Sequence, residues 1–188
     1  MPKYLKDLEF LYRLEQPSLY IQTIILRAHS QEHRCYIALL YLTGARPSEL
    51  QRLRVGDCKV IGEELAITIP TTKRGFTRTV KFTLESPFLR THVLPYISYV
   101  EASSQGEIGH ENRLFLKDIS TYKKMLYKVS DKTLTPYSFR HHRMTALAHL
   151  GANEQELKYW KGSKSTSSVE PYIHRSGIMI EKYKDKIK

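Results

Sequence analysis

Two arginines, a lysine and a tyrosine stand in settings from which they could act together on a phosphate. Arg46 follows a Thr-Gly-Ala turn, Arg140 lies in the basic stretch TPYSFRHHR, and Lys73 lies in a polar turn. Arginine donates paired hydrogen bonds to phosphate oxygens and keeps its charge. Tyr172, in SKSTSSVEPYIHRSG, is a useful nucleophile only where cations or a base assist, because the ordinary tyrosine pKa is about 10. Such a set could transfer a phosphoryl group without a metal.

The motifs of metal and nucleotide sites are absent from the sequence. It has no HExxH, no CxxC, no acidic cluster and no Gly-rich phosphate loop. His141 and His142 are adjacent and would face different sides of a helix. We therefore expect neither a metal nor a cofactor, and we interpret Cys35 and Cys58 as buried, reduced thiols.

The charge of the chain indicates a polyanionic partner. Its 188 residues carry 30 Lys and Arg against 19 Asp and Glu, a net charge of +11. The basic residues are spread over several segments, which favours a basic face on a folded domain, and nucleic acid over an acidic membrane surface. No apolar run is long enough to cross a bilayer and no signal peptide is visible, so we expect a cytoplasmic protein without membrane contact.

The elements around these residues predict a mainly helical α+β domain with a small three-stranded antiparallel sheet. A buried helix over residues 35–42 would end at Gly44, and Pro47 would open the next helix, which leaves Arg46 at its entrance. Alternating apolar residues predict strands over 65–69 and 80–84, after a first strand in DCKVIG. The turn between the two long strands would carry Lys73, Arg74 and Arg78 at its tip.

The second half of the sequence predicts helices over residues 87–103, 117–129, 139–150 and 153–162. Residues 165–168 would open a turn or helix that carries Tyr172, and IMIEKYKDKIK would form a terminal helix. SSQGEIGHEN is predicted to be a loop, and Trp160 to be a core residue. We expect a single domain over 1–188, with an extension over 1–16 and a C-terminal segment over 176–188.

Four stretches resemble, in order, the motif boxes of the tyrosine recombinases, the phage integrase family. LLYLTGARPSELQRLRVGD is similar to the first arginine box, with T-G-x-R-x-x-E-L. ITIPTTKRGFTRTVKF resembles the β-hairpin with its lysine, and LTPYSFRHHRMTALAHLGA resembles the second box, usually P-H-x-L-R-H-x-x-A. WKGSKSTSSVEPYIH resembles the last box, usually L-G-H followed by Y-x-H. The second arginine and the tyrosine are 32 residues apart, which suits the family.

The resemblance implies a role for each matching residue. Tyr172 would attack a DNA phosphate and form a 3′-phosphotyrosyl link, while Arg46 and Arg140 would hold its nonbridging oxygens. Lys73 would protonate the departing 5′-oxygen, and Glu49 would brace the site from the family's buried acidic position.

Two positions depart from the boxes. Tyr137 stands where the second box usually has histidine, and Ser163 where the last box usually has histidine or tryptophan. Both can hydrogen-bond a phosphate oxygen, but which residue accepts the Tyr172 proton stays open, with His141 as one candidate. Arg143 is the alternative to Arg140. Further DNA contacts are expected from Arg74, Arg78, Lys164 and Arg175.

The resemblance implies site-specific DNA recombination, without metal or high-energy cofactor, on double-stranded DNA in a prokaryotic host cell. It implies a homotetramer on DNA in which residues 176–188 pass to a neighbouring copy. Only about 45 residues precede Arg46, so we expect no full N-terminal domain that clamps DNA, and either a catalytic fragment or a minimal enzyme with a weak grip on DNA. Two rival functions stay open: nicking and closing of single duplexes like a type IB topoisomerase, and a catalytically silent DNA-binding protein with the same fold.

Overall fold

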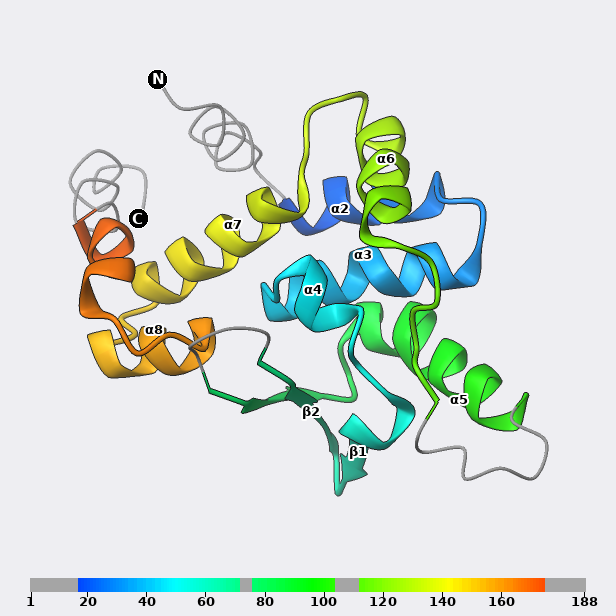
Figure 1. Cartoon of the computed structure of the whole chain (residues 1–188), viewed down its shortest axis with the longest axis horizontal. Coiled ribbons are helices and arrows are strands. Elements are labelled where there is room, and N and C mark those ends of the chain that lie inside the picture. Colours follow the sequence, from blue (N-terminus) through cyan, green and yellow to red (C-terminus); the bar gives the residue numbers. More distant parts are fainter. Residues whose placement is uncertain (1–16, 72–75, 104–111, 175–188) are drawn as a thin grey trace.

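The computed structural model describes residues 17–71, 76–103 and 112–174. It shows a mainly helical α+β fold with one small antiparallel sheet, as predicted (Figure 1). Helix α3 (Gln31–Thr43) lies at the centre, and the remaining long helices pack around it. These are α2 (Pro17–Leu26), α5 (Leu94–Ala102), α6 (Ile119–Val129) and α7 (Pro136–His149). In these described ranges no helix is long and apolar enough to cross a membrane.

Helix α3 is central because nearly all of its faces are apolar. Ser30 caps its start by accepting a hydrogen bond from the His33 amide, and residues 35–40 are completely buried. Gly44 ends the helix in the left-handed region with φ of 60°. The predicted helix over 35–42 is confirmed and begins four residues earlier, at Gln31.

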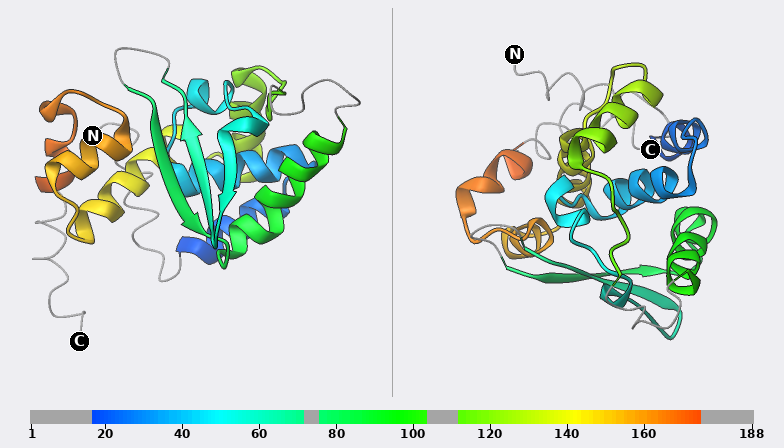
Figure 2. Two further views of the ribbon diagram at one scale, coloured as in Figure 1. Left: turned by 90° about the horizontal axis from the view of Figure 1, so that it is seen from below. Right: turned by 45° about the vertical axis from the view of Figure 1, so that its right-hand side comes forward.

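The sheet has the strand order β1 (Cys58–Ile61), β2 (Glu64–Ile69), β3 (Arg78–Thr83), with both pairs antiparallel (Figure 2). Ile67 of β2 pairs with Val80 of β3, and both side chains are buried. Strand β3 begins two residues before the predicted start and so includes Arg78.

The second half follows the predicted order of helices, with shifted boundaries. A π-helical turn, η2 (Leu89–Val93), leads into α5, and Asp118 caps α6. Helix α7 begins three residues before the predicted start, because Thr135 and Ser138 cap it reciprocally. The Ser138 amide donates a hydrogen bond to the Thr135 hydroxyl, and the Thr135 amide donates one to the Ser138 hydroxyl. Tyr137 therefore lies in the first turn of this helix. Helix α8 (Glu154–Lys161) is followed by the short η4 (Thr166–Ser168), and the last described residues, 170–174, are helical and carry Tyr172.

A second apolar cluster joins the tyrosine-bearing segment to the domain. It consists of Met144, Ala148, Leu157, Val169 and Tyr172. Trp160 packs against both this cluster and the main core. The predicted extension over 1–16 and the predicted terminal helix lie outside the described residues, as do residues 104–111 of the loop predicted in SSQGEIGHEN. Helix α2 was not predicted.

Candidate active site

Arg46 is fixed at the entrance of α4 (Pro47–Leu50) by Glu49. The Arg46 amide donates to Glu49 Oε2 over 2.9 Å, and Arg46 Nη1 donates to Glu49 Oε1 over 2.6 Å. The Arg46 side chain is 27% exposed, while that of Glu49 is completely buried. The carboxylate thus orients an arginine whose guanidinium is still reached from the surface.

Glu49 also binds Arg78, which crosses from the sheet. Arg78 Nη2 donates to Glu49 Oε2 over 3.1 Å, and both side chains are completely buried. Burial by itself raises the pKa of Glu49, but the charge of Arg78 and the amide of Arg46 lower it. Arg140 adds to this lowering, so the net shift in the Glu49 pKa is downward and favours the ionised carboxylate.

The prediction that Arg78 contacts DNA has to be corrected. Arg78 is 1% exposed, so in this structure its guanidinium braces the buried carboxylate and does not reach the surface. The sequence held the signal for this. Residues two apart in a strand lie on the same face, so Arg78 shares a face with Val80 and Phe82, which were predicted to point inward.

Arg140 links three parts of the site. It lies on α7, is 4% exposed, and donates from Nη1 to the Gly44 carbonyl over 2.8 Å and from Nη2 to the Lys161 carbonyl over 2.5 Å. Burial lowers its pKa to about 10, and the positive charge of Arg46 acts in the same direction. The alternative, Arg143, donates from Nε and Nη2 to the Tyr41 carbonyl instead. The structure therefore places Arg140, not Arg143, beside Arg46.

Tyr172 lies against the same helix. Its hydroxyl oxygen is 2.8 Å from His141 Nδ1, and His141 is the residue directly after Arg140. Arg140 is close enough to Tyr172 for the tyrosine to influence its pKa. Tyr172 is only 4% exposed, because its ring belongs to the second apolar cluster. The structure thus brings together Arg46, Glu49, Arg140, His141 and Tyr172.

Lys161 is a site residue that sequence reasoning missed. Its ammonium lies 4.9 Å from the centroid of the Tyr172 ring and donates to the Ser168 carbonyl. Burial and the charges of Arg140 and Arg46 lower its pKa to about 8. The available signal was its place in the last box, where a lysine stands at the position that the L-G-H pattern gives to leucine.

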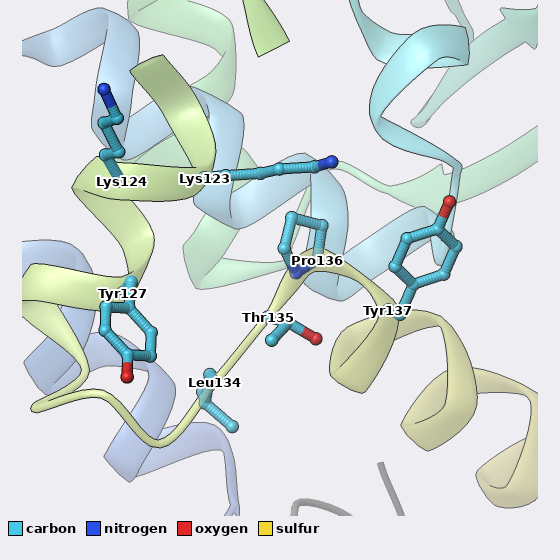
Figure 3. Close-up of a pocket in the computed structure, with 7 residues that line it drawn as sticks. All are labelled: Lys123, Lys124, Tyr127, Leu134, Thr135, Pro136 and Tyr137. Atoms are coloured by element: carbon cyan, nitrogen blue, oxygen red, sulfur yellow. The ribbon is translucent and has the colours of Figure 1, made fainter. Parts of the chain in front are cut away.

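Tyr137 and Ser163 lie on different elements. Tyr137 is half exposed and lines a pocket of about 390 Å³ between α6 and the start of α7 (Figure 3). In this view the Lys123 side chain extends past Pro136 toward Tyr137. Ser163 follows α8, and its hydroxyl oxygen accepts a hydrogen bond from Ser168 over 2.9 Å.

The remaining predicted site residues are Lys164, which the structure describes, and three residues that it does not describe. Lys164 is exposed directly after Ser163. Lys73, Arg74 and Arg175 lie outside the described residues, so their predicted roles stay predictions.

The site carries an excess of positive charge. Arg46, Arg78 and Arg140 gather around the carboxylate of Glu49, and Lys161 lies close enough to Arg46 and Arg140 for their charges to lower its pKa. Within the described part of the chain, no group of three or more His, Cys, Asp or Glu side chains could hold a metal ion. A cluster of this charge is suited to bind an anion such as a phosphodiester and to stabilise added negative charge on its oxygens.

Solved structures with the same fold are recombinases and integrases. XerA recombinase is 19% identical, with a TM-score of 0.67, covering 91% of this chain and 64% of that one. XerH site-specific recombinase, in a post-cleavage complex with palindromic difH substrate, is 16% identical, with a TM-score of 0.62, covering 96% and 50%. Tn1549 transposon integrase, in complex with transposon right end DNA, is 20% identical, with a TM-score of 0.56, covering 89% and 64%.

This chain therefore spans between half and about two thirds of those proteins. No curated protein sequence matches it significantly. The model of the phage integrase family matches residues 10–177, which include every predicted box. The chain belongs to the phage integrase family, and its fold is that of the catalytic domains of tyrosine recombinases.

Proposed function

We propose that this chain cuts and rejoins DNA strands in site-specific recombination, with Tyr172 as the nucleophile. One observation carries the proposal. Two arginines that are held by a buried carboxylate and by backbone carbonyls lie beside a tyrosine whose hydroxyl meets a histidine nitrogen at 2.8 Å. This arrangement combines phosphate binding with an activated nucleophile.

The proposed reaction is a transesterification, in which the phosphodiester bond of DNA is exchanged for a phosphotyrosyl ester of similar energy. The Tyr172 oxygen attacks the phosphorus, the bond between phosphorus and the 5′-oxygen breaks, and a 3′-phosphotyrosyl link forms. Arg46 and Arg140 stabilise the charge that builds on the nonbridging oxygens. Attack by the freed 5′-hydroxyl reverses these steps and rejoins the strand, so no high-energy cofactor is consumed.

The proton of Tyr172 has an acceptor within reach. When His141 carries its proton on Nε2, Nδ1 accepts the hydrogen bond of the tyrosine hydroxyl and can take that proton. We assign to Lys73 the donation of a proton to the departing 5′-oxygen, which leaves as a hydroxyl. Tyr137 and Ser163 are proposed to bind phosphate oxygens in place of the histidines of the family pattern.

The proposed substrate is double-stranded DNA, bound by a homotetramer. The net charge of +11 and the lysines beside Tyr137 in the pocket of Figure 3 support binding of a phosphate backbone next to the reacting group. The lysines that line this pocket are Lys123 and Lys124.

Capture of a covalent adduct tests the nucleophile. The purified chain is incubated in EDTA with a pool of nicked duplexes of randomised sequence, and adducts that survive denaturation are sequenced and mapped by mass spectrometry. We expect a DNA adduct at Tyr172 that is lost in Tyr172→Phe. Tyr99→Phe is the matched control, because it removes a hydroxyl from an exposed tyrosine on α5.

Other results would support the rival functions. Failure to trap any adduct, together with normal DNA binding, would indicate a silent DNA-binding protein. An adduct that forms on single duplexes, with no complex that joins two duplexes, would indicate topoisomerase-like activity. An adduct that requires an added divalent metal would overturn the proposed chemistry.

A further inference from the structure

Lys161 contacts both halves of the site. It is the last residue of α8, and the chain turns back after it at Gly162, which has φ of 61°. Because of this turn, the Lys161 ammonium reaches forward to the Ser168 carbonyl and to the face of the Tyr172 ring. Its own carbonyl accepts the hydrogen bond from Arg140 Nη2. Lys161 thus lies between the phosphate-binding arginines and the tyrosine-bearing segment.

The charge of Lys161 has no carboxylate partner among the described residues. The charged and titratable groups that act on it are Arg46, Arg140 of α7 and Tyr172. Arg78 of β3 approaches the neighbouring Gly162, and His141 of α7 meets the Tyr172 hydroxyl. Half-burial and two neighbouring guanidiniums disfavour an ammonium, which is why its pKa is lowered to about 8. An anion placed among these cations would reverse that effect and favour the charged form.

The segment that Lys161 holds carries the proposed nucleophile. Tyr172 is 4% exposed because its ring packs in the second apolar cluster, so movement of this segment would uncover the tyrosine for bound DNA. The Lys161 bond to Ser168 is one of the few polar links that tie this segment to α8. Among the described residues, Lys158 also donates to Thr166 over 3.3 Å, and Thr166 donates to Glu154 over 2.8 Å.

We propose that Lys161 is a further phosphate-contacting residue, and that its ammonium exchanges the Ser168 carbonyl for an oxygen of the DNA phosphate and thereby releases Tyr172 for attack. This inference rests on the proposed function. It explains why the nucleophile is buried in the free protein: the tyrosine stays covered until a phosphate lies between Arg46 and Arg140. A carbonyl is a neutral acceptor, and a phosphate oxygen is a charged and stronger one.

Lys158 provides the matched control. It lies one turn earlier on α8 and also binds the segment, but its ammonium is paired with Glu154 over 3.8 Å. Loss of Lys158 therefore removes a lysine and a link to the segment without removing a cation from the phosphate site.

The test measures two quantities on the same variants. Hydrogen exchange of the free protein reports the opening of residues 166–173, and trapping on a nicked duplex reports the rate of adduct formation. For Lys161→Met we expect roughly tenfold faster exchange in this segment, and adduct formation slower by about 10², as for one lost charge-stabilising donor. Lys161→Arg keeps a cation and should recover most of the rate of adduct formation. For Lys158→Met we expect a rate of adduct formation within about threefold of wild type.

A neutral phosphate separates contact with DNA from a merely structural role. When a methyl group replaces one nonbridging oxygen at the scissile phosphate, the penalty of Lys161→Met should shrink to within about threefold, because the charge it contacts is gone. An equal penalty on both substrates would overturn the phosphate contact.

Faster adduct formation by Lys161→Met would show that the lysine only holds the segment and does not contact the phosphate. Unchanged hydrogen exchange in residues 166–173 would show that Lys161 does not hold the segment. Either result overturns the inference while wild-type protein still forms adducts. Absence of adducts with wild-type protein would instead refute the proposed function itself.

Discussion

At the scale of residues, a single carboxylate organises the site. Glu49 binds the Arg46 side chain through one oxygen, and the Arg46 amide and Arg78 through the other. Ion pairs as deeply buried as that of Glu49 and Arg78 are costly to break, because removing one partner leaves a charge without compensation. The arginine that is proposed to hold the phosphate is therefore oriented by a carboxylate that is itself completely buried.

Glu49→Gln should lower the free energy of unfolding by about 3 kcal/mol at pH 7, the usual scale for breaking a buried pair. The pKa of Glu49 is lowered from its ordinary value of 4.5, so its ionised form stabilises the fold above about pH 4.5. This contribution is lost as the pH falls through the folded-state pKa, and the difference between variant and wild type should shrink with it. Urea unfolding at pH 7 and at about pH 3.5 measures both values.

Glu64→Gln is the control for this variant, because Glu64 forms an exposed pair with Lys81 over 3.1 Å. It should cost less than about 1 kcal/mol at either pH. Equal losses in the two variants would contradict a special role for the buried carboxylate.

At the scale of elements, the site lies where β3 meets the end of α8. A Cβ atom on Gly162 would come within 2.6 Å of Arg78 Nη1 and would displace the end of that side chain, and the left-handed backbone also favours glycine here. The hairpin between β2 and β3 contains Lys73, five residues before Arg78, and five extended residues span at most about 17 Å. This limit is compatible with the role proposed for Lys73, which lies outside the described residues.

A sulfur substitution tests the proposed acid. Lys73→Ala should cleave normal DNA slowly, because an unprotonated alkoxide is a poor leaving group. When sulfur replaces the bridging 5′-oxygen, the leaving thiolate, whose pKa is about 8.5 in a free cysteine, needs no proton. Lys73→Ala should then recover most of the wild-type rate of adduct formation.

Variants of the phosphate-binding groups serve as controls on the same substrate. Arg46→Ala and Lys161→Met should not recover, because their proposed contacts are to nonbridging oxygens. If sulfur fails to rescue Lys73→Ala, the lysine only positions DNA. Rescue of a variant of Arg74 or Lys164 would assign the acid to that residue instead.

At the scale of the whole molecule, the sequence predicted those elements whose structure follows from their own residue pattern. The apolar run of α3 predicted a buried helix, and the alternating apolar residues of β2 and β3 predicted two strands. Helix α2 was missed although Ile21, Ile24 and Ile25 are buried with helical spacing. The burial of Tyr172 and the contacts of Lys161 depend on how the chain folds back after α8, which no local pattern in the sequence shows.

The charge of the whole molecule predicts DNA binding that weakens steeply with salt. If about six phosphates are contacted, affinity should fall roughly 10³-fold between 50 and 200 mM salt. Replacing Lys123 and Lys124 together by alanine should lower the slope of log affinity against log salt by about 2. Lys117→Ala should leave the slope unchanged, since Lys117 is paired with Glu32. Fluorescence anisotropy over a salt series measures these slopes, and a flat dependence would contradict a basic DNA face.

The last prediction concerns assembly through the groove between the end of α7 and α8. This groove of about 830 Å³ includes Leu150, which is 81% exposed, together with Tyr159 and Glu156. Residues 176–188 combine apolar side chains with several lysines, which suits an apolar groove that carries one carboxylate, that of Glu156. We therefore expect the groove to receive this segment from a second copy of the chain on DNA.

Deletion of residues 176–188 and Leu150→Asp should each abolish complexes that join two duplexes in native gels. Both should retain adduct formation on a single nicked duplex, because neither change touches the phosphate site. A mixture of the two proteins is the sharper measurement. The deleted chain keeps its groove and the Leu150→Asp chain keeps its segment, so one exchange in one direction remains possible. The mixture should form pairs on DNA that neither protein forms alone, and no tetramers. Pairs in either protein alone would contradict exchange through this groove.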